Sequence, residues 1–170
     1  MDTTFIVNFI GKATPATIKE LTAITHENGG KWLISKVNFI EDQVAAVVKI
    51  NLPKQNEETV KNAFCDYKDL IVQFVDSNAS MHAKSEIFSL RIDANDRAGI
   101  VNEITQVLDD QGIHIVDMDC HRVFVAGGGG VSSSLFSAQV AIQIPSQISI
   151  DDITNELESL SEDTRVIITT

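Results

Sequence analysis

The stretch that decides the fold is Ile92-Asp93-Ala94-Asn95-Asp96-Arg97-Ala98-Gly99-Ile100-Val101. Apolar and polar residues alternate from Phe88 to Asn95, which predicts a strand with one covered face. From Gly99 the apolar residues recur at helical spacing, which predicts a helix from near Ala98 to about Asp110. Asn95 and Asp96 are good capping residues. The stretch therefore predicts a strand, a polar turn and a helix in succession.

The polar turn has the chemistry of a small anion site. The first turn of a helix carries N–H groups without a helical partner, and the positive end of the helix dipole lies behind them. Gly99 has no side chain, so backbone or a ligand can approach it closely. Such a turn suits the carboxylate of a small ligand. The alternative is a capped connection between strand and helix that binds nothing.

The order of elements occurs twice along the chain. The pattern strand, helix, strand, strand, helix, strand runs from Phe5 to Val75 and then begins again at Phe88. A shift of 83 residues aligns the first part of the two copies, and after a longer loop a shift of 92 aligns the rest. The aligned pairs are Phe5 with Phe88, Glu20 with Glu103, Leu21 with Ile104, Thr22 with Thr105, Gly29 with Gly112, Ala46 with Ala138, Val48 with Val140, Ile50 with Ile142 and Pro53 with Pro145. These matches fall in strands and at helix ends, where a shared fold places them, so we predict a tandem repeat.

The repeat also predicts the domains. We expect a first domain at residues 1–76, a small polar linker at 77–84 and a second domain at 85–170. Each domain has the pattern of an α+β, ferredoxin-like βαββαβ sandwich, with two helices on one face of a four-stranded antiparallel sheet. The open face of the first sheet is expected to be apolar, with Ile6, Ile10, Ile34 and Val47. That of the second is expected to be polar, with Arg91, Asp117, Asp119, His121, Ser137 and Gln139.

One loop distinguishes the two domains. The second carries the Gly- and Ser-rich segment Gly127–Ser134, and the two alignment shifts make this loop nine residues longer than its counterpart. Successive glycines cost backbone entropy and hold no fixed shape without a partner. No Gly-Lys-Ser or Gly-Lys-Thr follows, which argues against a phosphate-binding loop. We expect a mobile flap, with a lid or a partner contact as the alternative.

Composition and charge narrow the class of protein. The 170 residues are 44% hydrophobic, which is ample for a buried core, and the net charge is −11, which argues against direct binding of nucleic acid. Residues 1–84 hold nine Lys and ten acids, whereas residues 85–170 hold four Arg and fourteen acids. The acidic second half suits solubility or a basic protein partner. Apolar runs are short and the N-terminus lacks a basic leader, so we expect a cytoplasmic protein without a membrane partner.

Catalytic and metal-binding patterns are scarce. Cys65 and Cys120 are too few for a disulfide framework, and we expect both to be buried, reduced thiols. His114, Asp117, Cys120 and His121 resemble a metal cluster, but strand alternation predicts that 114 and 120 face one side while 117 and 121 face the other. We therefore predict no catalytic residue, no metal site and no cofactor.

Two segments resemble the ACT domain, whose usual turn reads Asp-Arg-Pro-Gly followed by an apolar pair. They are Asn95–Val101, with Ala98 in place of the proline, and Gln111–Asp117 after the helix. In the first domain Lys12-Ala13-Thr14-Pro15-Ala16 has lost the acidic residue, the arginine and the glycine, so only its scaffold is similar to the family. Two such domains with nothing else attached, the second with a long loop, resemble the glycine cleavage system transcriptional repressor group.

This resemblance implies a regulatory protein and not an enzyme. It implies that the chain binds a small amino acid, glycine or similar, and controls transcription through contact with an activator protein and not through DNA. In ACT domains the ligand usually lies where the first turn of one domain meets the second strand of a neighbour, which leads us to expect a homodimer. The ligand-binding residues implied here are Asn95, Asp96, Arg97, Ala98, Gly99 and Ile100, with Asp117 as a candidate for the ligand's ammonium group.

The altered first turn and the apolar face of the first sheet leave an alternative open. The chain would then be a ligand-independent protein-interaction module, or a detached regulatory subunit of an amino-acid metabolic enzyme.

Overall fold

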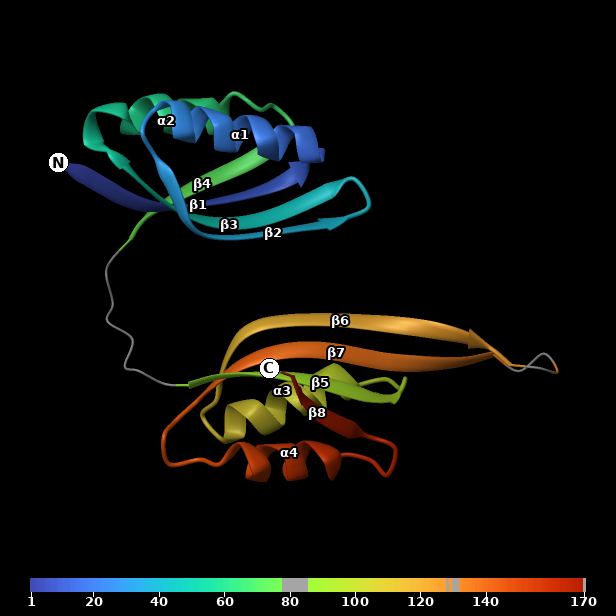
Figure 1. Cartoon of the computed structure of the whole chain (residues 1–170). Coiled ribbons are helices and arrows are strands. Elements are labelled where there is room, and N and C mark those ends of the chain that lie inside the picture. The colour runs from blue at the N-terminus through green and yellow to red at the C-terminus, as the bar shows by residue number, and fades with distance from the viewer. Residues whose placement is uncertain (78–85, 128, 130–131, 170) are drawn as a thin grey trace. The chain divides into compact units, whose positions relative to one another are not determined.

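A computed structural model of the chain describes residues 1–77, 86–127, 129 and 132–169 (Figure 1). The chain forms two compact units, Met1–Ser80 and Met81–Thr170. Each unit has the order strand, helix, strand, strand, helix, strand. The predicted linker at residues 77–84 lies, except for Ser77, outside the described residues.

The first unit is an antiparallel sheet covered on one face by two helices (Figure 1). Its elements are β1 (Asp2–Lys12), α1 (Pro15–Glu27), β2 (Lys31–Ile40), β3 (Gln43–Pro53), the short 3-10 helix η1 (Lys54–Asn56), α2 (Glu57–Cys65) and β4 (Leu70–Asp76). The strands lie in the order β2-β3-β1-β4. The central strands β1 and β3 pair along their whole length, with Val7 opposite Val48.

The second unit repeats this arrangement (Figure 1). Its elements are β5 (Glu86–Asn95), α3 (Ile100–Asp110), β6 (His114–Ala126), β7 (Ser132–Ile144), α4 (Ile150–Glu158) and β8 (Arg165–Thr169). The strand order β6-β7-β5-β8 matches that of the first unit. The predicted fold class, an α+β protein with two ferredoxin-like βαββαβ sandwiches in tandem, is confirmed.

Several of the residue pairs that align in the sequence repeat lie in the two hydrophobic cores. Leu21 on α1 and Ile104 on α3 are both buried, and so are Val48 on β3 and Val140 on β7. Each core lies between one face of its sheet and the two helices. The repeat is therefore visible in sequence because both units must fill the same layer with apolar side chains.

Glycine ends the first helix of each unit. Gly29 after α1 and Gly112 after α3 have φ angles of 74° and 67°, which favour glycine over any residue with a Cβ. The Gly112 N–H donates to the carbonyl of Asp109, and the next N–H, that of Ile113, donates to the carbonyl of Leu108. The same two hydrogen bonds close the end of α1. These bonds satisfy carbonyls that the last helical turn leaves without a partner.

The helices are short, and their bounds differ slightly from the predicted ones. The second helix of the first unit, α2, spans Glu57–Cys65. The helix after the deciding turn begins at Ile100 and not near Ala98.

Within the part of the chain that the structure describes, every helix falls short of the length and apolar content that a bilayer crossing needs.

The open faces of the two sheets differ, but less sharply than predicted. In the second unit the strand register places Arg91 and Asp119 on either side of Gln139, and His121 opposite Ser137. In the first unit three large apolar side chains of the open face are half exposed or more, namely those of Ile10, Ile34 and Val47, at 51%, 60% and 53%. Ile6 lies on the same face and is partly covered. The first unit therefore exposes an apolar sheet surface. The second exposes a mixed one, because the large apolar side chains of Ile87, Val123, Leu135 and Ile167 are also exposed on it.

One cysteine is not buried. Cys120 is partly buried, but Cys65 is exposed, so the prediction of a buried thiol is wrong for Cys65. The buried residues of α2 are Val60 and Phe64, four apart, and a residue that follows Phe64 is rotated by about 100° away from that face. Burial raises the pKa of the Cys120 thiol, which keeps it protonated at neutral pH.

Candidate functional site

The turn between β5 and α3 is held by backbone hydrogen bonds to two distant segments. The Asp96 N–H donates at 2.9 Å to the carbonyl of Ser134, a residue of β7. The Asn95 N–H donates to the carboxylate of Asp163 at 2.5 Å, in the segment before β8. That hydrogen bond holds the pKa of Asp163 below its ordinary value, so the carboxylate is ionised at neutral pH. The turn is therefore tied to both the β6–β7 hairpin and the last connection of the unit.

The side chain of Asp96 strengthens the link to the hairpin. Its carboxylate accepts hydrogen bonds from Arg122 Nε at 2.9 and 3.1 Å and from Ser134 Oγ at 3.1 Å. The side chain of Asp96 is only 19% exposed, whereas that of Arg122 is 52% exposed. Asp96 thus holds the turn in place by accepting hydrogen bonds from β6 and β7.

Arg97 reaches forward to the helix. Its Nη1 donates to Glu103 Oε1 at 2.7 Å, and its Nη2 donates to Glu103 Oε2, so the guanidinium and the carboxylate meet by two parallel hydrogen bonds. The guanidinium holds the pKa of Glu103 below its ordinary value, and the carboxylate raises the pKa of Arg97. Both groups stay charged across the neutral range.

Gly99 sets the backbone at the start of α3. It has a φ of 86° and is the N-cap residue, and its carbonyl accepts the first helical hydrogen bond, from the Glu103 N–H at 3.0 Å. A Cβ at this position would meet nothing nearer than Glu103 Oε1 at 3.9 Å. Glycine is therefore required for its left-handed conformation and not for space. This conformation also explains why the helix starts at Ile100, which is buried, and not at the exposed Ala98.

The structure brings six of the seven predicted site residues together and leaves one apart. Asn95, Asp96, Arg97, Ala98, Gly99 and Ile100 form the continuous turn. Asp117 lies opposite Ala141, whereas Asn95 lies opposite Leu135, six residues along the same strand β7. At 3.4 Å per residue the separation is roughly 20 Å. Asp117 is thus at the far end of its own sheet from the turn.

A bulge near the start of β6 changes which of its residues share a face. Before the bulge His114 lies opposite Gln143, and after it Asp117 lies opposite Ala141, on the same face of β7. Cys120 faces the other way. The prediction that His114 shares a side with Cys120 is therefore wrong, because the extra residue reverses the alternation. Among the described residues no three His, Cys, Asp or Glu side chains lie together in a way that could hold a metal ion.

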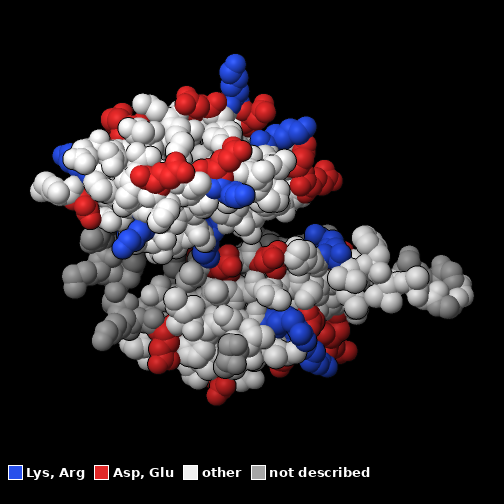
Figure 2. All heavy atoms as spheres, turned by 45° about the horizontal axis from the view of Figure 1, so that its top comes forward, with Lys and Arg blue, Asp and Glu red and all other residues white. Residues whose placement is uncertain are grey.

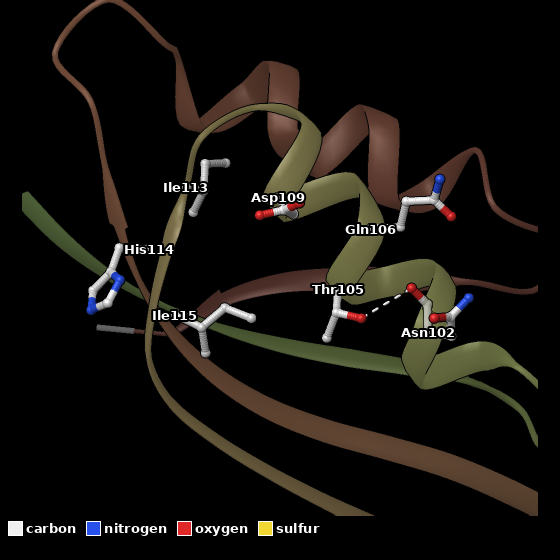
Figure 3. A pocket seen from close by; sticks show the side chains of 7 residues that line it. All are labelled: Asn102, Thr105, Gln106, Asp109, Ile113, His114 and Ile115. Carbon is white, nitrogen blue, oxygen red and sulfur yellow. Dashed lines mark hydrogen bonds between the residues drawn. The ribbon is translucent and has the colours of Figure 1, made fainter.

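A hollow of about 600 Å³ lies beside α3 and the start of the edge strand β6 (Figure 3). Figure 3 shows its lining: four residues of α3, one residue before β6 and the first two residues of β6, namely Asn102, Thr105, Gln106, Asp109, Ile113, His114 and Ile115. The Thr105 hydroxyl donates to the carbonyls of Val101 and Asn102 and so is engaged by its own helix. The hollow follows the side of the helix and is separate from the turn at its N-terminus.

The corresponding turn of the first unit has different chemistry. Thr14 is the N-cap residue of α1, and Pro15 occupies the first helical position. The Ala13 N–H donates to the Asp42 carbonyl at 3.2 Å, and Lys12 pairs with the Asp42 carboxylate at 3.1 Å. The Arg–Glu and Asp–Arg pairs of the second unit have no counterpart among these residues. The two turns share a backbone course but not a set of charged groups.

The sequence did not point to several partners that hold the turn. Arg122, Ser134 and Asp163 lie 26, 38 and 68 residues from their hydrogen-bonding partners in the turn. The alignment of the two repeats identifies Glu103 only as a residue that both repeats share. The sequence signal for its pairing with Arg97 is its position, six residues after Arg97 and one helical turn past Gly99.

The face drawn in Figure 2 bears on the expected lack of nucleic-acid binding. Over its described residues, Lys and Arg side chains are dispersed among Asp and Glu side chains. A phosphate backbone is bound by clustered cations. This face offers no such cluster.

Comparison with known proteins gives structural but not sequence relatives. No family model matches the chain, and no curated protein matches it. A solved structure of a protein described as unknown, from Galdieria sulphuraria, is similar over 100% of both chains, with a TM-score of 0.80 and 15% identity. A structure provisionally described as a glycine cleavage system transcriptional repressor is similar over 99% of this chain and 97% of that one, with a TM-score of 0.66 and 13% identity. At these identities the similarity shows the fold alone.

Proposed function

We propose that this chain is a non-catalytic, cytoplasmic regulatory protein that binds a small amino acid, glycine or similar, at the turn Asn95–Ile100. Through contact with a transcription activator, and not with DNA, it would control transcription. The observation that carries the proposal is the turn itself. A left-handed Gly99 opens a helix whose first N–H groups are available to a carboxylate, and two charge pairs hold that backbone in place. The fold-level similarity to a protein described as a glycine cleavage system repressor supports the direction of the proposal.

A homodimer belongs to this proposal. Asp117, the candidate for the ligand's ammonium group, lies roughly 20 Å from the turn of its own unit by strand register. It can contribute only if a second copy of the chain supplies it. A ligand held by two copies would favour the arrangement that it binds better, and it could shift the equilibrium only by that difference in affinity.

Calorimetric titration of the purified chain with glycine, serine and other amino acids tests the proposal. Gly99→Ala should weaken binding, because a Cβ disfavours the left-handed conformation that orients the N–H groups. Gly112→Ala is the matched control. Gly112 is also left-handed, with open space around it, but it lies at the other end of α3. The proposal fails if no amino acid binds, or if both variants bind as the wild type does.

The apolar open face of the first unit favours a second candidate, a ligand-independent protein-interaction module or a detached regulatory subunit of an amino-acid metabolic enzyme. Ile10, Ile34 and Val47 are half exposed or more on this face, and Ile71 on the neighbouring strand is 72% exposed. Scattered apolar residues are normal on a surface, but a contiguous patch of this kind often contacts protein. Affinity capture that recovers a metabolic enzyme and no transcription factor would favour this candidate.

A further inference from the structure

A second hollow, of about 520 Å³, lies on the open face of the second sheet, immediately beside the turn. Its apolar wall comes from three strands: Val123 on β6, Leu135 on β7 and Ile167 on β8. These side chains are 50%, 41% and 42% exposed. The volume lies in the range of small-molecule sites, which are mostly apolar with a few polar groups at the edge.

Charged groups of both signs lie at the edge of this hollow. Arg165 contributes a guanidinium whose Nη1 donates to the carbonyls of Glu162 and Thr164, at 3.0 and 2.8 Å. These two bonds anchor the group while Nε and Nη2, which carry the remaining three of its five N–H donors, stay available. Asp163 contributes a carboxylate that already accepts the Asn95 N–H and is ionised at neutral pH.

The third charged residue of the lining, Asp93, is already paired. Its carboxylate accepts hydrogen bonds from Arg91 Nε at 2.9 Å and from Ser137 Oγ at 2.7 Å. Asp163 accepts hydrogen bonds from two neutral groups, the Asn95 N–H and the Ser161 side chain, whereas Asp93 already pairs with the Arg91 guanidinium. A ligand cation would therefore meet Asp163 more readily than Asp93. The hollow thus offers one cation-binding group, one anion-binding group and an apolar wall.

We propose that this hollow binds a free amino acid with an apolar side chain of about the size of leucine. Arg165 would take the α-carboxylate, Asp163 the α-ammonium, and Val123, Leu135 and Ile167 the side chain. The inference goes beyond the proposed function, because it adds a second site, which binds amino acids with larger side chains than glycine. Asp163 joins the two sites, since its carboxylate holds the Asn95 N–H of the turn and lies within electrostatic reach of Arg97. An ammonium group at Asp163 would alter the charge beside the turn.

Calorimetry on the full chain with leucine, glycine, leucinamide and N-acetylleucine tests the assignment. Burial of a leucine side chain should make leucine bind about 10- to 100-fold more tightly than glycine at this site. Leucinamide lacks the carboxylate and N-acetylleucine lacks the ammonium, so each should bind more weakly than leucine. Arg165→Gln should remove the difference between leucine and leucinamide. Asp163→Asn should remove that between leucine and N-acetylleucine, and it keeps an oxygen that can accept the Asn95 N–H.

Matched variants separate the apolar wall from the rest of the face. Ile167→Ser should lower leucine affinity by about 10-fold, whereas Ile87→Ser, an exposed isoleucine outside the hollow, should leave it unchanged. Asp119→Asn is the control for Asp163→Asn.

The possible outcomes distinguish this inference from the proposed function. Glycine binding that Gly99→Ala weakens, combined with leucine binding no tighter than that of glycine, would overturn the inference and leave the proposed function standing. Leucine binding that depends on Ile167 and Arg165, without glycine binding at the turn, would do the reverse. Equal binding of leucine, leucinamide and N-acetylleucine would indicate an apolar peptide surface and would also overturn the inference. If no amino acid binds, both proposals fail.

Discussion

Single charged residues of the second unit hold the turn in shape through pairs that titrate. The Arg97 guanidinium holds the pKa of Glu103 below its ordinary value, so the folded state binds this proton less readily than the unfolded state. The stability from this pair is therefore fully present above the unfolded pKa of Glu103. It is lost as pH falls through the lower pKa of the folded state. The side chains of Arg97 and Glu103 are 34% and 38% exposed, and screening by solvent therefore keeps the contribution of this pair to stability small.

Glu103→Gln should therefore reduce stability at neutral pH. Its effect should diminish as the pH falls from about 5 toward about 3, the range in which an exposed carboxyl takes up its proton. Urea unfolding at a series of pH values measures this convergence. A constant difference between Glu103→Gln and wild type across the whole range would contradict the assignment.

A second residue-scale prediction concerns Tyr67 in the first unit. Its hydroxyl donates to Glu20 at 2.5 Å, and this hydrogen bond raises the pKa of Tyr67 to about 12. Because the folded pKa exceeds the unfolded value of 10.0, the associated stability is present below that value and is lost as pH rises through the folded pKa. Tyr67 is the only tyrosine of the chain, so phenolate absorbance follows it directly.

The absorbance titration should give an apparent pKa of about 12 for wild type and a value nearer 10.0 for Glu20→Gln. Circular dichroism recorded in parallel shows whether the chain is still folded at each point. A wild-type titration at the ordinary value, with the fold intact, would exclude the Tyr67–Glu20 hydrogen bond in solution.

At the scale of the element, the glycine in strand β1 and the glycine after helix α1 are needed for different reasons. Gly11 on β1 has a φ of 143°, and a Cβ there would lie 2.0 Å from the carbonyl oxygen of Asp69. Gly29 after α1 is also left-handed, but a Cβ there would only touch Pro53 Cγ at 3.4 Å. The first glycine is needed for close backbone approach and the second for conformation alone.

Gly11→Ala should therefore destabilise the first unit by about 2–4 kcal/mol, since the backbone of β1 or of the Asp69 turn must shift. Gly29→Ala should cost about 1 kcal/mol, the penalty for a Cβ in the left-handed region. Chemical denaturation of the two variants compares them within one unit. Equal costs would mean that the approach of Gly11 to Asp69 is looser than the structure indicates.

At the scale of the whole molecule, each unit has the components of an independent domain. The buried residues divide into two hydrophobic clusters, one from Phe5 to Leu70 and one from Leu90 to Leu157. Each cluster is enclosed by the sheet and helices of its own unit. The predicted division at residues 1–76 and 85–170 stays a proposal, and it leads to a direct test.

Fragments spanning residues 1–80 and 81–170 should each fold and unfold cooperatively. Circular dichroism should show mixed helix and strand for both, and thermal or urea unfolding should be a single transition in each. The isolated first fragment should be the less soluble of the two, because its charges nearly balance whereas the second half of the chain is strongly acidic. An unfolded fragment would show that the two halves depend on one another for stability.

The fold was accessible from the sequence because its signals are local and repeated. Alternation from Phe88 to Ala94, helical spacing after Gly99 and the glycine stops at Gly29 and Gly112 all act within a few residues, and the second copy supplied independent support. The polar and apolar open faces followed from the same alternation. Exposure of Cys65 was missed because the amphipathic face of a nine-residue helix is narrow.

What the sequence by itself determined is the backbone course, the tandem βαββαβ pattern and the identity of the turn Asn95–Ile100, since these depend on neighbours along the chain. Only the tertiary structure decided that Asp96 is held by Arg122 and Ser134, that Asp163 binds the Asn95 N–H, and that Asp117 lies at the far end of the sheet. It also decided that a bulge turns His114 toward the face of Asp117. Strand pairing brings together residues that are tens of positions apart, and one extra residue reverses every side chain beyond it. No local pattern contains that information.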